Sequence, residues 1–164
     1  MESTVEKMEF RKVKLSPFHA ICLTHYGSYD SPSINENWDK LLAYAFKNNL
    51  LTEHSQFFGE ILDDNEVTKD ENCRYIGGIT LPENLNFEPE GFFQIKNFEG
   101  GNYAVFQYRG DRKKIESFYE LIFVRWITIN DFEIIDQPIM EFYLNDKEDT
   151  PIEDLLTDIY IPIE

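Results

Sequence analysis

Glu141 interrupts an otherwise apolar run, residues 139–144 with the sequence IMEFYL. Such a run predicts a strand, and because strand side chains alternate between faces, Ile139, Glu141 and Tyr143 share one face. A carboxylate removed from water costs several kcal/mol unless a cation pairs with it, so a buried Glu141 would favour a positively charged ligand. The pattern is also that of an exposed carboxylate on a solvated face, with Met140, Phe142 and Leu144, on the opposite face, in the core.

Other residue types that carry catalysis or metal binding lack the necessary spacing. The histidines His19, His25 and His54 form no HxxH or HExxH pattern and no cluster with acidic residues at ligand spacing. The chain has no GxSxG nucleophile motif and no glycine-rich phosphate loop, since the glycine pairs at 77–78 and 100–101 are typical of bends and turns. We therefore expect no metal and no cofactor.

The charge balance disfavours one class of partner. The 15 Lys and Arg residues stand against 31 Asp and Glu residues, which gives a net charge of −16. Nucleic acid would be repelled, so we expect no direct nucleic-acid binding, whereas cations and basic partners would be attracted. The dense carboxylates at 146–154 could also mimic nucleic acid on the basic surface of a DNA enzyme, although a solvated loop explains them as well.

Cysteine usage and the N-terminus indicate the compartment. Cys22 and Cys73 lie in apolar, strand-like runs, where we expect buried reduced thiols, with a single disulfide as the alternative. The charged N-terminus lacks the apolar core of a signal peptide. No apolar run approaches the roughly 20 residues that span a bilayer. The sequence predicts a cytoplasmic protein without membrane contact.

The elements that must position these residues follow from periodicity and turn signals. Ser33 is expected to cap a helix, with Glu36 completing a capping box, and the helix ends near Asn48. Asp111 is expected to cap a second helix, whose apolar stripe ends at Trp126. Strands are predicted at 5–13, 19–26, 57–62, 74–81, 92–98, 103–108, 138–144 and 157–163.

The order of elements repeats within the chain. Similar residues recur roughly 81 to 85 positions apart, which suggests copies at about 5–82 and 90–164 within a single domain, 1–164. Chance similarity between amphipathic segments is the alternative. The matches are Ala20-Ile21-Cys22 with Ala104-Val105-Phe106, Gly27 with Gly110, Trp38 with Tyr119, Leu62-Asp63-Asp64 with Leu144-Asn145-Asp146, and Tyr75-Ile76 with Tyr160-Ile161.

A duplicated strand-helix-strand-strand module predicts the fold. One copy cannot bury both a sheet face and a helix stripe well, whereas two copies can form one antiparallel sheet with two helices on the same face. We therefore predict an α+β fold in which a pseudo-twofold axis relates the modules. A cleft between the helices would be the default ligand site.

An ordered series of short motifs resembles the GyrI-like effector-binding family. Members of that family include the drug-binding domains of AraC- and MerR-type multidrug regulators and stand-alone gyrase-inhibitor-like proteins. Each motif is weak alone, but the series covers nearly the whole chain. The motifs are HYGSY at 25–29, Trp38 with Leu41, LDD at 62–64, CRY at 73–75, GGNYAV at 100–105, Gly110, Trp126, PIMEFY at 138–143 and TDIYIPI at 157–163.

The resemblance implies a central pocket whose buried acidic residue meets cationic, aromatic ligands. That acidic residue corresponds to Glu141, and a second acidic position to Asp158. The aromatic wall corresponds to Tyr160 and, through the repeat, to Tyr75, because flat rings hold aromatic cations by stacking and cation–π attraction. Supporting positions are Tyr143 and Trp126. Without the resemblance, Tyr75 and Tyr160 are also ordinary half-buried strand tyrosines, and Trp126 is a core residue.

These observations lead to one functional hypothesis and two alternatives. The hypothesis is a stand-alone protein that binds small cationic or aromatic compounds, and any regulatory output requires a separate partner chain, because no helix-turn-helix region fits in the remaining sequence. One alternative is a hydrolase of small electrophilic molecules, similar to some GyrI-like proteins, with Glu141 as general base. The other is an acidic inhibitor of gyrase or of another DNA-binding enzyme.

Overall fold

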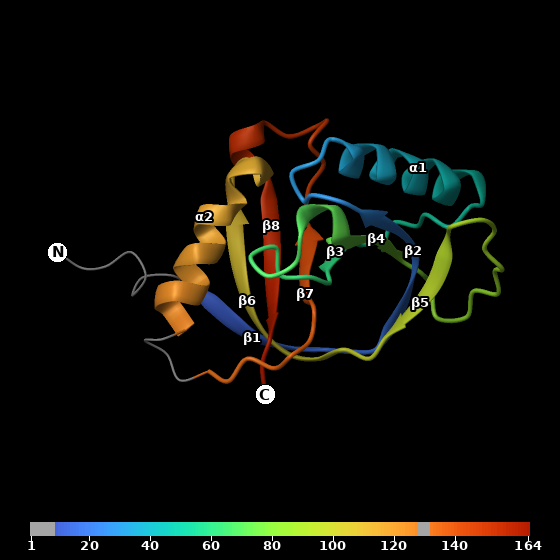
Figure 1. Cartoon of the computed structure of the whole chain (residues 1–164). Coiled ribbons are helices and arrows are strands. Elements are labelled where there is room, and N and C mark those ends of the chain that lie inside the picture. Colours follow the sequence, from blue (N-terminus) through green and yellow to red (C-terminus); the bar gives the residue numbers. More distant parts are fainter. Residues whose placement is uncertain (1–8, 128–131) are drawn as a thin grey trace.

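Strands of the described residues join into a single curled antiparallel sheet (Figure 1). The computed structural model describes residues 9–127 and 132–164, and within them eight strands follow the order β1-β6-β8-β7-β3-β4-β2-β5. The predicted α+β class with an antiparallel sheet is therefore confirmed. The strands are β1 (Phe10–Leu15), β2 (Phe18–Tyr26), β3 (Phe57–Ile61), β4 (Arg74–Thr80), β5 (Gln94–Phe98), β6 (Gly101–Arg109), β7 (Ile139–Tyr143) and β8 (Leu156–Pro162).

The strand order has the symmetry expected of a duplication. Outward from the central β3–β7 pair, one side runs β4, β2 and the other runs β8, β6. The two outermost strands are exchanged, because β1 pairs with β6 and β5 pairs with β2. Gly59 lies opposite Glu141 across the central pair, so the pseudo-twofold axis passes between these two residues. The first predicted strand, 5–13, lies partly outside the described residues.

The register corrects one detail of the predicted repeat. Gly59 pairs with Gly77 on β4, and Glu141 pairs with Ile159 on β8. The symmetry therefore relates Gly77 to Ile159, and two residues earlier it relates Tyr75 to Thr157. The predicted equivalence of Tyr75 and Tyr160 is wrong, because it is displaced by an odd number of residues, and such a displacement moves a side chain to the other face of a sheet.

Helix α1 (Ser33–Lys47) covers the half of the sheet that contains β2 and β4. Its buried residues Leu41 and Ala45 pack in a cluster with Ile21, Leu23 and Ile79. The helix ends at Lys47 with Asn48 as its C-cap, close to the predicted end near Asn48.

The predicted capping box at the start of α1 is wrong. The hydroxyl of Ser33 lies 2.5 Å from Nε2 of His25 and makes no cap, so a link from strand to helix replaces the local cap. The backbone N–H of Ser33 instead donates to the hydroxyl of Ser31 at 3.2 Å.

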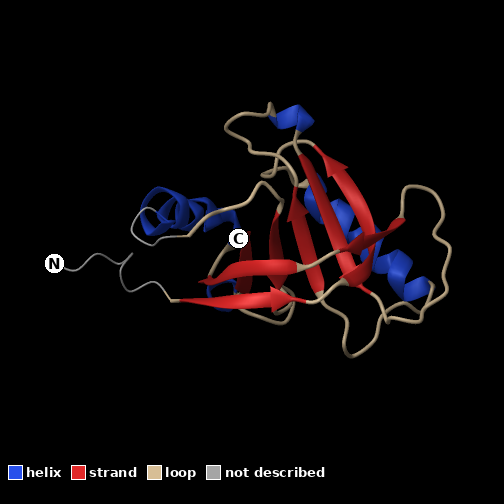
Figure 2. Ribbon diagram, turned by 90° about the horizontal axis from the view of Figure 1, so that it is seen from below, coloured by secondary structure: helices blue, strands red, loops and turns tan. Residues whose placement is uncertain are grey.

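The second helical region is irregular. A 3₁₀ turn, η2 (Arg112–Lys114), leads into α2 (Ile115–Glu120), which continues as a π-helical segment, η3 (Leu121–Trp126). The carboxylate of Asp111 accepts a hydrogen bond from the backbone N–H of Lys113, which confirms the predicted cap. Ile122 and Trp126 pack on β6 and β8. Figures 1 and 2 show α2 and α1 well apart on the sheet.

The two faces of the sheet bury different sets of side chains. The helix face carries the clusters beneath α1 and α2, with Glu141 and Tyr143 between them. The inner face, on the inside of the curl, buries a cluster made of Ala20, Cys22, Phe58, Ile76, Phe98, Met140 and Phe142. Both cysteines are buried free thiols, as expected.

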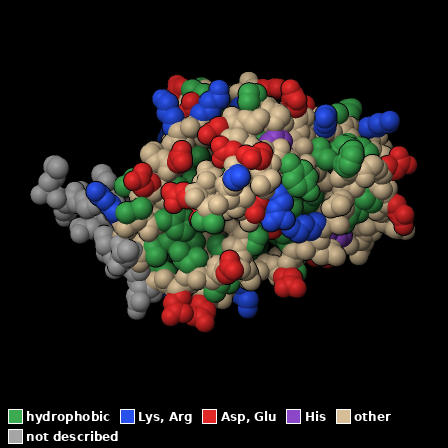
Figure 3. Space-filling view, viewed as in Figure 1, with side chains coloured by type: hydrophobic (Ala, Val, Ile, Leu, Met, Phe, Trp, Pro, Cys, Tyr) green, Lys and Arg blue, Asp and Glu red, His purple; other side chains and the backbone are tan. Residues whose placement is uncertain are grey.

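Two further features concern the surface. Acidic side chains are spread over the face shown in Figure 3, with basic side chains among them. No helix in the described residues is long and apolar enough to cross a membrane.

Candidate functional site

Glu141 occupies the centre of the molecule, in the middle of β7 and beside the pseudo-twofold axis. Its side chain is directed to the helix face, and the residue is only 9% exposed. The hydroxyl of Tyr143 donates to Oε1 of Glu141 at 3.0 Å. The hydroxyl of Tyr119, which α2 supplies, donates to Oε2. Both carboxyl oxygens are therefore engaged by tyrosine hydroxyl groups.

A chain of hydrogen bonds extends from this carboxyl group to the other helix. The hydroxyls of Tyr75 and Tyr143 lie 2.6 Å apart, and the indole N–H of Trp38 on α1 donates to the Tyr75 oxygen at 3.0 Å. Since the Tyr143 proton points to Glu141, Tyr143 must accept from Tyr75. Every donor in the chain is therefore aligned toward the carboxylate, from Trp38 through both tyrosines.

A glycine at the symmetry-related position creates the room for this cluster. Gly59 pairs with Glu141, and a Cβ atom at Gly59 would lie 2.4 Å from the Tyr75 hydroxyl oxygen. Any other residue would displace the Tyr75 ring. The two halves therefore contribute unequally at the axis: one supplies a carboxylate, and the other supplies the space that an aromatic ring fills.

Burial dominates the electrostatics of the cluster. It raises the pKa of Glu141, and the hydrogen bonds from Tyr119 and Tyr143 and the charge of Arg112 oppose that rise. Burial also raises the pKa of Tyr75, Tyr119 and Tyr143, and the nearby carboxylate raises each further. The tyrosines are therefore neutral hydrogen-bond donors at neutral pH.

The structure brings together three of the six residues predicted for the pocket: Glu141, Tyr75 and Tyr143. Asp158 and Tyr160 lie on the inner face. Asp158 accepts from Arg11 at 2.7 Å and from Gln107 at 3.0 Å. Tyr160 packs beside Phe142, with ring centroids 4.8 Å apart.

Trp126, the sixth predicted residue, lies in the core beneath η3. It packs between Phe106 and Phe132, with ring centroids 4.7 and 5.0 Å away.

Sequence reasoning missed three members of the cluster: Trp38, Tyr119 and Arg112. The repeat contained a signal for two of them, because Trp38 and Tyr119 are matched positions on the predicted helices and each reaches the axis from its own helix. Arg112 follows a strand and a turn, where no periodicity marks it. Its guanidinium carbon lies 4.7 Å from the centroid of the Tyr143 ring.

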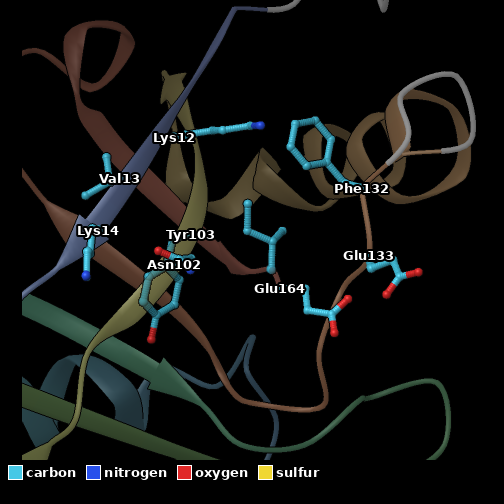
Figure 4. Close-up of a pocket in the computed structure, with 9 residues that line it drawn as sticks. Lys12, Val13, Lys14, Asn102, Tyr103, Phe132, Glu133 and Glu164 are labelled. Carbon is cyan, nitrogen blue, oxygen red and sulfur yellow. The ribbon is translucent and has the colours of Figure 1, made fainter.

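An open groove of about 550 Å³ lies elsewhere, at the β1 edge of the sheet (Figure 4). Its lining contains none of the residues around Glu141, whose carboxyl group is enclosed by its own tyrosines. No group of acidic, histidine or cysteine residues in ranges 9–127 and 132–164 could hold a metal ion. The groove is lined by Lys12, Val13, Lys14, Asn102, Tyr103, Phe132, Glu133, Ile163 and Glu164.

Comparison with known proteins identifies the family. The sequence pattern of the GyrI-like small molecule binding domain matches residues 8–164. The chain belongs to this family.

The GyrI-like chain is 27% identical over 165 residues to YosT of Bacillus subtilis, a match that covers all of both chains. It is 29% identical over 113 residues to YgiV of Escherichia coli, covering 66% of this chain and 68% of YgiV. The names of both relatives class them as candidate transcriptional regulators.

Solved structures show the same fold at low sequence identity. The C-terminal domain of EcmrR matches with a TM-score of 0.74 and 13% identity, covering 96% of this chain and 98% of that one. SAV2435 bound to tetraphenylphosphonium matches with a TM-score of 0.62 and 15% identity, covering 96% and 94%. A hydrolase from Listeria innocua matches with a TM-score of 0.70 and 10% identity, covering 96% and 92%. Such identities establish the fold of this GyrI-like chain and no more.

Proposed function

We propose that this protein binds small molecules in which a positive charge adjoins an aromatic ring system, with Glu141 as the charge partner. The observation that carries the proposal is the environment of that carboxyl group. It is 9% exposed, it receives hydrogen bonds from tyrosine hydroxyls, and it forms no ion pair within the described part of the chain. A carboxylate left without an opposite charge in a buried position favours a cation that can enter.

The side chains around Glu141 suit an aromatic cation. The rings of Tyr119 and Tyr143 adjoin the carboxyl group through their hydrogen bonds, and Tyr75 and Trp38 extend the aromatic cluster through Tyr143. A cation over such a ring gains roughly 0.5–2 kcal/mol, and the contact tolerates varied ligand shapes. The structure of SAV2435, which shares the fold, holds bound tetraphenylphosphonium, a phosphonium cation that carries four phenyl rings. That ligand has the chemistry that we propose for this site.

Ligand entry requires a change at Tyr119. Its hydroxyl occupies Oε2 of Glu141, so a ligand cation reaches that oxygen only after Tyr119 has moved away. Tyr119 and Tyr143 are half-buried, whereas Tyr75 is 5% exposed, which makes the first two the outer side of the cluster. The π-helical segment η3 begins two residues after Tyr119, and such segments often lie at functional sites. We place the entrance on the α2 side.

The test is a titration of wild type and two variants with tetraphenylphosphonium and with rhodamine 6G. Glu141→Gln keeps the size and a hydrogen-bond acceptor but removes the charge, and we expect affinity to fall about 10- to 100-fold, as for loss of a charge-assisted contact. Asp158→Asn is the matched control, since it removes a buried carboxylate on the inner face. We expect its affinity to stay within about twofold of wild type. Unchanged affinity in Glu141→Gln would refute the proposal.

Hydrolysis of an electrophilic small molecule is the second candidate function. The specific observation in its favour is the aligned donor chain that ends on Glu141, because such a chain would orient this carboxylate as a general base, and burial raises its pKa. The expected result is turnover of an epoxide substrate by wild type that disappears in Glu141→Gln and persists in Asp158→Asn. Binding of the cationic dyes without any turnover of the epoxide would refute the hydrolase function and retain the binding function.

A further inference from the structure

Arg112 lies beside the Glu141 cluster and is held by neutral groups. Its Nε–H donates to the hydroxyl oxygen of Thr157 at 3.0 Å. Its Nη2 donates to the carbonyl oxygens of Asn145 and Leu156, at 3.3 and 3.5 Å. The guanidinium group also lies over the ring of Tyr143. These contacts fix the position of the positive charge but do not neutralise it.

This arrangement differs from that of three other arginines, each of which pairs with an aspartate. Within the described residues no carboxylate forms an ion pair with Arg112, although the chain has a net charge of −16 and acidic partners are abundant. The guanidinium is half-buried, and its Nη1 has no hydrogen-bond partner among those residues. The three pairs are Arg11 with Asp158, Arg74 with Asp63, and Arg109 with Asp154.

Tyr143 separates the unpaired positive charge from the unpaired negative charge. The guanidinium carbon of Arg112 is 4.7 Å from the Tyr143 ring centroid, and the hydroxyl of the same ring is 3.0 Å from Glu141 Oε1. The two charges are thus about one tyrosine side chain apart. They are close enough to influence each other, because the positive charge of Arg112 acts to lower the pKa of Glu141.

We infer that Arg112 is the anion-binding end of this site, so that the preferred ligand is zwitterionic. The positive group of the ligand replaces the Tyr119 hydroxyl at Oε2 of Glu141, and a carboxylate on the same ligand reaches Arg112. This inference rests on the proposed function, and it narrows the ligand class from cations in general to molecules that carry both charges. Nothing among the described residues accepts from the N–H groups of Nη1, so they are open to a ligand carboxylate, and a hydrogen bond between a charged donor and a charged acceptor is stronger than one between neutral groups.

Arg112 also has a structural role, and the experiment must separate the two. Its bonds to Asn145 and Leu156 link η2 to the connection after β7 and to the first residue of β8. Arg112→Lys keeps the charge but loses the planar fork that makes these bonds. Arg112→Gln removes the charge while it retains a donor for Thr157. A preference that depends on charge therefore survives in Arg112→Lys and disappears in Arg112→Gln.

The test compares two dyes that differ by one carboxylate. Rhodamine 110 carries a free carboxylate, and rhodamine 123 is its methyl ester with the same cationic ring system. We expect wild type and Arg112→Lys to bind rhodamine 110 at least about fivefold more tightly than rhodamine 123, because a charge-assisted contact favours the acid. Arg112→Gln should bind both dyes equally, and thermal melting of each variant checks that it is folded.

The outcomes distinguish this inference from the proposed function. If wild type binds both dyes equally, or if Arg112→Gln keeps the preference, Arg112 is not the anion-binding group, while the role of Glu141 stands. If Glu141→Gln binds rhodamine 123 as tightly as wild type does, the proposed function fails, and this inference fails with it. If neither dye binds to wild type, both are overturned.

Discussion

Two buried carboxylates on adjacent strands have opposite surroundings. Asp158 lies on the inner face, 4% exposed, and pairs with Arg11 at 2.7 Å and with Gln107 at 3.0 Å. Glu141 lies on the helix face, 9% exposed, and is bonded to the hydroxyls of Tyr119 and Tyr143. The inner face thus neutralises its carboxylate, whereas the helix face solvates one with neutral groups. The two acids therefore differ in their partners, although their burial is nearly the same, and this difference is the basis for proposing Glu141 rather than Asp158 as the binding acid.

Glu60 extends the comparison to a third carboxylate. It lies on the inner face, 6% exposed, and forms an ion pair with Lys96. Both buried acids of the inner face therefore have a basic partner near the surface, since the side chains of Arg11 and Lys96 are 52% and 39% exposed. Such pairing reduces the cost of burying an acid. Among the described carboxylates compared, Glu141 alone lacks it.

The largest expected effect comes from filling the space that the helix face requires at the axis. In Gly59→Ala, the new Cβ atom would collide with the Tyr75 hydroxyl at 2.4 Å, and Tyr75 is held by Trp38 and Tyr143. We expect the free energy of unfolding in urea to fall by about 3 kcal/mol. Gly77→Ala is the control, since its Cβ would lie 3.3 Å from the Trp38 ring, and its effect should be smaller. Equal stability of Gly59→Ala and wild type would contradict the tight packing described for the site.

The next effect tests the structural role of the inner-face pair. Arg11→Ala leaves Asp158 buried with Gln107 as its remaining side-chain partner. We expect a loss of about 2 kcal/mol in the free energy of unfolding, less than for a fully buried pair because the Arg11 side chain is 52% exposed. Adding Asp158→Asn to this variant should restore part of the stability. If Arg11→Ala and wild type have the same free energy of unfolding, the ion pair does not stabilise the buried acid of the inner face as described.

Substitution of Glu141 is expected to increase the free energy of unfolding, in contrast to the two substitutions above. Glu141→Gln should stabilise the ligand-free protein on the order of 1 kcal/mol at pH 7, because an amide is less costly to bury than a charge. The raised pKa of Glu141 in the folded state means that protonation favours folding. The stability of wild type relative to Glu141→Gln should therefore fall as pH rises above the ordinary value of 4.5 and through the raised pKa. Urea unfolding of both proteins between pH 4 and pH 8 measures this difference, and a parallel pH dependence would count against it.

The smallest effect concerns the competition between Tyr119 and the ligand. Tyr119→Phe removes the hydroxyl that occupies Glu141 Oε2, so a cation no longer has to replace that hydrogen bond. We expect rhodamine 6G affinity to increase about threefold, in line with the modest net value of one hydrogen bond. Tyr108→Phe is the control, because the Tyr108 hydroxyl donates to the backbone of Asp111. Weaker binding by Tyr119→Phe would show that this hydroxyl contacts the ligand directly.

The sequence was sufficient for the architecture and for the centre of the site. Alternation along β7 predicted that Glu141 and Tyr143 share a face, and both indeed form hydrogen bonds on the helix face. The repeat predicted a duplicated α+β fold, which the strand order confirms. These features depend on local periodicity and on the order of elements, which a single sequence records well.

The remaining members of the site depend on register and tertiary contacts, which the sequence records poorly. The match of Tyr75 with Tyr160 had the right residue type, but strand pairing relates Tyr75 to Thr157. Helical periodicity does not reveal the role of the Tyr119 hydroxyl, because its partner Glu141 lies on a strand 22 residues away. Arg112 has neither periodicity nor a motif, since its position depends on a turn and on two backbone carbonyls.

The exchange of the outermost strands has a consequence for how the chain folds. Because β1 pairs with β6 and β5 pairs with β2, each half lends an edge strand to the other. Pairing Phe10 with Phe106 requires closing a long loop, and such non-local pairing slows folding. A half expressed by itself would retain an uncovered strand edge, which invites self-association. Cooperativity between the halves is therefore built into the backbone, independently of any side chain at the axis.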